Sequence, residues 1–286
     1  MENIVQVLIS AISLGFTFGM LGIGLSLIFG TVEVVNFAHG ESLMMSMYLA
    51  YWLYILLGLD PILSLPICAL VLFISGCLIH KIIIKPLLHA EMLTQIMATF
   101  GLALFMSSLA QFLWGPNFRA IQHSVLNLKW YIFGASIQSG LVIMIVFALA
   151  TLSILMWIIY KTDIGLAILS VSEDRDTASL MGINPDTMYM LTWGIGLACV
   201  GITGAILSGI FYISPLMGAN FSTLSYIAVA MGGFGSLIGA FIGAFLVGFI
   251  QVVAAYILPP SFKLLVVFVI FIIVVLLKPK GFLGRY

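Results

Sequence analysis

"VVNFAHGES", residues 34–42, interrupts a long apolar run near the amino terminus. The segments on either side, "GMLGIGLSLIFG" and "LMMSMYLAYWLY", are predominantly apolar and each is compatible with a helix. Within the interruption, Asn36, His39 and Glu41 fall within six residues, and Gly40 lies between two of them. A helix break is therefore expected around residues 36–40, at or just inside the boundary of whatever surrounds the two helices.

The composition identifies those surroundings as a membrane. Of the 286 residues, 63% are hydrophobic and only 7% are charged, against roughly 25% charged in soluble domains. We therefore predict an all-α polytopic membrane protein, with residues 1–286 forming one transmembrane domain. The start, "MENIVQ", has no basic residue and does not fit a cleavable signal peptide. The net charge of zero gives no indication of a nucleic-acid partner.

Hydropathy predicts about eight full transmembrane helices plus one short or broken helix, because a span needs about 20 apolar residues. The predicted full spans are 4–30, 38–58, 62–84, 92–114, 138–160, 188–211, 237–258 and 262–278. The short segment is "STLSYIAVAMGG", residues 222–233, which is too short to cross alone. Whether it crosses or re-enters is open at this point.

The basic residues predict the orientation, because cytoplasmic loops are enriched in Lys and Arg. If the short segment counts as a crossing, seven of the ten basic residues share one side: Lys81, Lys85, Lys161, Arg175, Lys278, Lys280 and Arg285. The other side holds Arg119, Lys129 and Lys263. We therefore expect a cytoplasmic carboxy terminus and an amino terminus outside.

Two connections are long enough to have functions of their own. Residues 115–137 form the external loop, and its Trp130, Tyr131 and Arg119 fit either an aromatic interface belt or a docking surface. Residues 161–187 form the cytoplasmic loop and hold seven of the charged residues.

The cytoplasmic loop has the pattern of a short capped helix. Ser170 and Glu173 have the spacing of a capping box, and Gly182 and Pro185 predict its end. Ala178 and Met181 would form an apolar ridge on this helix. The pattern fits a solvated loop or, more specifically, a rigid helix presented to a cytoplasmic protein.

A second helix break is expected in the other half of the chain, around 232–236 in "AVAMGGFGSLIGAFIGAF". Glycine-interrupted segments in both halves indicate a transport path. The candidate residues of the path or gate are Asn36, Phe37, His39, Glu41, Gly232, Gly233 and Gly235. The polar ones could contact solute, or could gate the path and cap the broken backbone. Gln251, alone in an apolar span, is interpreted as an interhelical hydrogen bond.

Enzymatic motifs are missing from the sequence. There is no G-x-x-x-x-G-K-[ST] nucleotide-binding loop and no H-E-x-x-H metal motif, and Ser236 has no neighbouring acid or base. The cysteines, Cys68, Cys77 and Cys199, have no metal-ligand spacing. We expect no enzyme activity, no metal and no cofactor bound by this chain.

Several segments resemble the permeases of the branched-chain amino-acid ABC importers, specifically the LivH-type subunit. They are "GLSLIFGTVEVVNFAHGESLMMSMYLA", "DIGLAILSVSEDRDTASLMGIN", "AVAMGGFGSLIGAFIGAFLVG" and "KPKGFLGR". Their order along the chain is that of the family, and residues 115–137 carry the least resemblance. The resemblance implies two structurally related membrane halves and a bacterial or archaeal plasma membrane.

The resemblance also implies partners: a LivM-type second permease, two ATPase subunits that bind ATP and Mg, a periplasmic solute-binding protein, and membrane lipid. The segment from Ser172 to Gly182 would be the coupling helix, with its contacts supplied by Glu173, Asp174, Ala178, Met181 and Gly182. The family's glutamate has no plain counterpart, because Arg175, Asp176 and Thr177 precede Ala178. The implied solutes are leucine, isoleucine and valine.

Two alternatives remain for the function. Urea and short amides are carried by permeases of the same family. A secondary transporter or channel working alone could also have two broken helices, but it would have no use for a capped cytoplasmic helix.

Overall fold

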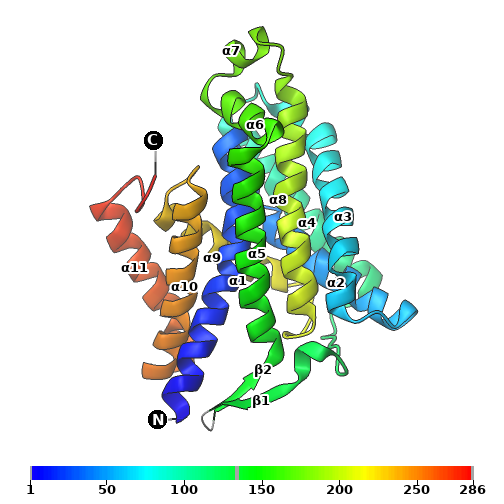
Figure 1. Ribbon diagram of the computed structural model, residues 1–286, viewed down its shortest axis with the longest axis vertical. Helices are drawn as coiled ribbons and strands as arrows, with labels where there is room; N and C mark the ends of the chain where they lie inside the picture. The colour runs from blue at the N-terminus through cyan, green and yellow to red at the C-terminus, as the bar shows by residue number, and fades with distance from the viewer. Residues whose placement is uncertain (1, 133–134, 285–286) are drawn as a thin grey trace.

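The computed structural model describes residues 2–132 and 135–284 (Figure 1). The helices are α1 (Glu2–Val32), α2 (His39–Leu57), α3 (Pro61–Ile79), α4 (Met92–Trp114), α5 (Ser139–Lys161), α6 (Asp163–Glu173), α7 (Arg175–Leu180), α8 (Pro185–Ser208), α9 (Met217–Gly232), α10 (Leu237–Ile257) and α11 (Lys263–Leu277). A π-helical turn, His80–Ile84, continues α3. Two strands, β1 (Lys129–Ile132) and β2 (Ala135–Gln138), form an antiparallel hairpin inside the predicted external loop.

Within the described residues, seven helical segments are long and apolar enough to cross a membrane. They correspond within three residues to seven of the eight predicted full spans. The predicted span 38–58 is α2, which is not among the seven because its first turn holds His39, Gly40 and Glu41. The chain is therefore an all-α polytopic membrane protein with one small hairpin, and the predicted eighth full span, at α2, stays a prediction.

The chain has two distinct ends in Figure 1. We call them the hairpin end, which carries β1, β2 and the amino terminus, and the α7 end, which carries α6 and α7. Helix α1 runs through the bundle between them, with α10 and α11 on one side and α5 and α8 on the other. The carboxy-terminal segment lies toward the α7 end, where Leu283 N–H donates to the Gly232 carbonyl over 2.9 Å.

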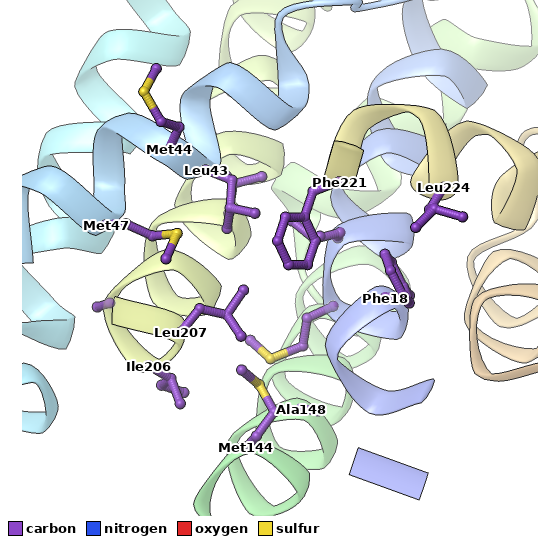
Figure 2. Close-up of a cluster of buried hydrophobic side chains, with 14 of the residues drawn as sticks. Phe18, Leu43, Met44, Met47, Met144, Ala148, Ile206, Leu207, Phe221 and Leu224 are labelled. Atoms are coloured by element: carbon purple, nitrogen blue, oxygen red, sulfur yellow. The ribbon is translucent and has the colours of Figure 1, made fainter. Parts of the chain in front are cut away.

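Small residues allow α1 and α10 to approach closely, as expected of small-residue spacing in membrane helices. Gly15 lies against Phe245, and Gly19 lies against the ring of Phe241. A side chain at either glycine would therefore separate the two helices. Side chains from several helices fill the neighbouring core, where the rings of Phe18 and Phe221 are 5.7 Å apart (Figure 2).

The predicted division of the basic residues agrees with the arrangement of the ends. Lys85 pairs with Asp186 over 3.0 Å at the α7 end. The segment 209–216 follows α8 at the hairpin end and leads into α9, whose last turn reaches the α7 end. Segment 209–216 and α9 together thus carry the chain from one end to the other, which is the parity that the orientation prediction required. Arg285 lies outside the described residues.

Arg119 of the external loop faces inward. Its guanidinium lies 5.4 Å from the ring centres of both Tyr51 and Trp52, and it donates to the Trp114 carbonyl over 2.8 Å. Trp130 is half exposed, and the Tyr131 side chain lies outside the described part of the structure. Arg119 is half-buried and fastens the loop to α2 and α4.

Candidate functional site

The first helix break lies deep inside the bundle. Helix α1 ends at Val32, and Glu33 turns the chain back with a left-handed φ of 57°. The chain then descends beside α1, so that His39 Nε2 lies 3.1 Å from the Leu21 carbonyl oxygen. Leu21 lies eleven residues before Val32, about 16 Å along a helix axis. The broken segment therefore packs back into the protein and does not stay level with the end of α1.

Side chains from α4 and α9 satisfy the irregular backbone of this break. Thr99 Oγ1 donates to the Val35 carbonyl over 2.9 Å, and Ser222 Oγ donates to the Phe37 carbonyl over 3.2 Å. The Tyr226 hydroxyl donates to the Asn36 carbonyl. A non-helical segment at membrane depth is tolerated only when its polar groups are satisfied in this way. Sequence reasoning missed Thr99, Ser222 and Tyr226, because nothing local links them to the break.

The predicted polar residues of the first break are brought together and buried. Asn36 and His39 are each 1% exposed, and Glu41 is 5% exposed. Asn36 Oδ1 accepts from the Ala38 N–H over 3.1 Å. Among the described residues, Asn36 Nδ2, His39 Nδ1 and Glu41 Oε2 have no hydrogen-bond partner. The Leu21 carbonyl can only accept, so the neutral His39 ring carries its proton on Nε2 and leaves Nδ1 as a free acceptor.

Helix α9 begins beside the start of α2, so the amino-terminal ends of these two helices meet inside the bundle. We call α2 and α9 the half-helices, because both begin inside the bundle. A Cβ on Gly40 would collide with the Gly218 carbonyl oxygen, and the Glu41 carboxyl lies against Gly218. Helix amino termini carry partial positive charge, so Glu41 lies at two of them. The segment 209–216 leading to α9 is held by Ser107 Oγ donating to the Pro215 carbonyl over 3.2 Å. This second internal break was missed, although Gly209 and Pro215 are a signal for it.

The predicted break at 232–236 does exist, but it lies at the α7 end of the bundle, apart from the first break. Helix α9 ends at Gly232, Gly233 has a φ of 106°, and α10 begins at Leu237. Gly235 abuts Gly30 near the end of α1. The turn also accepts the carboxy-terminal segment, since Phe282 N–H donates to the Met231 carbonyl over 2.8 Å.

The predicted path residues therefore fall into two separate groups. Asn36, Phe37, His39 and Glu41 lie inside the bundle. Gly232, Gly233 and Gly235 lie at the α7 end. The first break contacts the start of α9. It does not contact the end of α9, where the second predicted break lies.

The predicted coupling segment forms two helices in place of one. Asp174 caps α7: its Oδ1 accepts from the N–H groups of Asp176 and Thr177, each over 3.0 Å, and its Oδ2 accepts from the Thr177 hydroxyl over 2.6 Å. The predicted capping box was wrong, because Ser170 lies inside α6 and donates to the Leu166 carbonyl over 2.9 Å. The predicted role of Gly182 as the end of the helix is confirmed, with a φ of 86°.

The apolar ridge on α7 is also different from the prediction. Ala178 is buried and packs with Val34, Ile84 and Tyr189. Leu180 and Met181 are 88% and 80% exposed. The prediction that Ala178 and Met181 form the apolar ridge was therefore wrong. The exposed apolar pair is Leu180 and Met181. Leu180 was missed because its position depends on where α7 starts.

Charged groups hold α7 to the bundle. Asp186, in the first turn of α8, pairs with Lys85 over 3.0 Å and with Arg175 over 3.9 Å. The Arg175 guanidinium also lies 5.9 Å from the centre of the Tyr189 ring. These groups are partly exposed, so each contributes little energy by itself. Together they orient α7 against the bundle. Glu173 lines a small cavity of about 60 Å³ together with Gly235.

Comparison with known proteins identifies the kind of protein that carries these features. A family model described as "Branched-chain amino acid transport system / permease component" matches residues 7–275. The chain belongs to this family. It is therefore a transport subunit rather than an enzyme, and a multi-pass inner-membrane protein.

Curated relatives extend over nearly the whole permease. The high-affinity branched-chain amino acid transport permease LivH of Escherichia coli K12 is 30% identical over 98% of this chain and 95% of its own length. The corresponding protein BraD of Pseudomonas aeruginosa is 28% identical, with the same coverage. A probable LivH of Methanocaldococcus jannaschii is 27% identical over 93% of this chain and 88% of its own length.

A solved structure of PsaBC from Streptococcus pneumoniae in complex with Fab aligns with 98% of the permease and 93% of that chain, at 18% identity and a TM-score of 0.48.

The contact between the two half-helices generates a stability prediction. We expect Gly40→Ala to destabilise the permease by about 1–3 kcal/mol, because the added Cβ overpacks a backbone contact. Gly101→Ala in α4 is the matched control, since a Cβ there meets nothing within 4 Å. The control should gain about 0.5–1 kcal/mol from helix propensity. Thermal unfolding in detergent checks both, and equal stabilities would contradict the proposed contact.

The cap of α7 generates a second prediction. The hydrogen bonds from Thr177 hold the pKa of the Asp174 carboxyl below its ordinary value. The cap is therefore fully present at neutral pH and is lost only as the pH falls through that lowered pKa. We expect Asp174→Ala to accelerate amide hydrogen exchange across residues 176–180 at neutral pH, and Asp174→Asn to do so less. Unchanged exchange in Asp174→Ala would show that the cap does not stabilise α7.

Proposed function

We propose that this chain is one permease subunit of an ATP-driven ABC importer for branched-chain amino acids. The observation that carries the proposal is the family match over residues 7–275, together with relatives named as branched-chain amino acid transport permeases over almost the full chain. The other subunits of the importer would be a LivM-type permease, two ATPase subunits and a periplasmic binding protein. ATP and Mg would bind to the ATPase subunits.

Helix α7 supports the proposal of an ATPase partner. Leu180 and Met181 expose apolar side chains on a short helix that is capped at both ends. The Ile183 N–H closes the carboxyl end by donating to the Ala178 carbonyl over 3.1 Å, as in a Schellman motif. Leu180 and Met181 thus form an apolar projection outside the membrane spans, which we call the knob. Such a projection suits a groove in a partner protein. In this proposal Glu173, Asp174 and Gly182 fix the ends of the helix that carries the knob. Ala178 packs that helix against the bundle.

Packing also provides a route from the knob to the first break. Ala178 packs in a cluster with Val32 and Val34, which flank the turn at the end of α1. Asn36 follows two residues later. A displacement of α7 driven by ATPase closure would thus be transmitted to the broken segment, as in rigid-body rocking of one domain against another.

The half-helices support a gate inside the bundle. Asn36, His39 and Glu41 are costly to bury in a membrane protein and, when they occur, commonly mark a functional path. In the proposal they gate the passage between this chain and its partner permease, with Phe37 at the edge of the gate against Phe100. Gly232, Gly233 and Gly235 form the cytoplasmic hinge of α9. The α7 end and the carboxy terminus would be cytoplasmic, in keeping with its basic residues.

Charge substitutions on the knob test the coupling. In membranes that contain the assembled importer, we expect Leu180→Glu with Met181→Glu to lower ATP-dependent leucine uptake about thirtyfold or more. The reason is that burying a charge in an apolar docking contact costs about 2 kcal/mol or more. Leu180→Met with Met181→Leu is the matched control and should retain uptake, because it keeps volume and hydropathy.

The same experiment separates the alternatives. Uptake that continues at the wild-type rate in the doubly charged variant would refute the coupling role. Leucine uptake without ATP and without co-purifying ATPase activity would favour a secondary carrier. Urea or acetamide transport without leucine transport would keep the importer and change its solute.

A further inference from the structure

A cavity of about 730 Å³ lies at the hairpin end of the bundle, between α1, α5, α9, α10 and α11. This volume falls in the range of about 300–1,000 Å³ that is typical of small-molecule sites. The first two turns of α9 line it through Met217, Asn220 and Thr223. The cavity therefore leads to the same half-helix start that meets Gly40 and Glu41.

Gln251 of α10 is a buried polar group directed into this cavity. It is 7% exposed and lines the cavity. The sequence interpretation assigned it an interhelical hydrogen bond, but its amide makes no hydrogen bond within the described residues. Its amide atoms are not among the fully enclosed polar atoms that lack a partner, so they reach the open space of the cavity. A water or a ligand in the cavity can therefore pair with the amide.

The charges around the cavity favour an anionic group. Lys263 is the only ionisable side chain among the described residues that line it, and it is exposed at the start of α11. The amino terminus of α9 supplies partial positive charge at the same cavity. Its N-cap residue, Leu216, is apolar and leaves the first turn without a side-chain cap. Because the Glu41 carboxyl already lies against this turn, Lys263 is the lining group that would bind a ligand carboxylate.

Much of the rest of the lining is apolar. Phe18 of α1 and Phe221 and Leu224 of α9 line the cavity and also belong to the core cluster of Figure 2. Phe268 of α11 completes this wall. The cavity thus combines a carboxylate-binding side, hydrogen-bonding groups such as Gln251, and an aliphatic or aromatic wall.

We propose that this cavity is the receiving site of the chain for the amino-acid zwitterion as it leaves the binding protein. Lys263 binds the carboxylate, oxygen atoms of Gln251 and Thr223 accept from the ammonium group, and the branched side chain lies against Phe18 and Phe221. Passage from this site toward Glu41 requires the contact between Gly40 and Gly218 to open. The inference rests on the proposed function and names the first solute site within it.

Uptake by the complete importer in proteoliposomes tests the site. We expect Lys263→Gln to raise the half-saturating concentration of the leucine-loaded binding protein about tenfold, because a hydrogen bond to a charged group is lost. Lys129→Gln is the matched control: it removes an exposed cation from the same end that does not line the cavity, and its uptake should not change. Thr223→Trp should block uptake by filling the cavity. ATPase activity and thermal unfolding verify that each variant is assembled.

Chemical protection gives a second measurement that does not depend on turnover. Asn220→Cys places a thiol in the cavity, and the wild-type chain gives the background from Cys68, Cys77 and Cys199. We expect leucine to slow labelling of this thiol by a maleimide, and leucinamide, which lacks the carboxylate, to protect much less. The assay is run in neutral phosphatidylcholine vesicles and in vesicles containing phosphatidylglycerol.

The outcomes separate the two levels of the argument. Leucine uptake that is unchanged in both Lys263→Gln and Thr223→Trp would overturn the receiving site and leave the importer intact. Protection by phosphatidylglycerol with no effect of leucine would also overturn it, by assigning the cavity to lipid. A wild-type complex that neither transports leucine nor is protected by it would overturn the proposed function and the site together.

Discussion

The backbone polar groups of residues 33–38 must be satisfied inside an apolar bundle, and much of the central architecture follows from this requirement. Water is not available there in quantity, so each free N–H or C=O would cost several kcal/mol. Thr99, Ser222 and Tyr226 meet the requirement from two other helices. These bonds fix α4 and α9 against the broken segment, and they place the start of α2 about a third of the way back along α1 from its end.

Once α2 starts inside the bundle, the second half-helix can begin beside it. The contact of Gly40 with Gly218 leaves no room for a side chain at either position, and it directs two helix amino termini to one place. Glu41 lies at that place with one oxygen unpaired. Buried polar groups that lack a partner are costly inside a membrane protein, and those that occur there commonly mark a functional path.

The same packing connects the centre to the α7 end. Val34 belongs both to the broken segment and to the cluster beneath Ala178. Helix α9 starts at the internal contact and ends in the turn that holds Gly235 and the carboxy-terminal segment. Two packed connections therefore run between the α7 end and the starts of α2 and α9. Such an arrangement suits a protein whose energy is supplied by another subunit.

The sequence by itself determined the class of protein, seven of the spans and the positions of both predicted breaks, because hydropathy and glycine patterns are local properties. It also identified Asn36, His39 and Glu41 as a group, since they are neighbours in the chain. Only the tertiary structure decided how deep that group lies, which residues satisfy it and that Leu180 replaces Ala178 on the exposed face. These properties depend on contacts between residues 60–190 positions apart and on the residue at which a helix starts. A shift of one residue in that start rotates every side chain by about 100°, which no local pattern resolves.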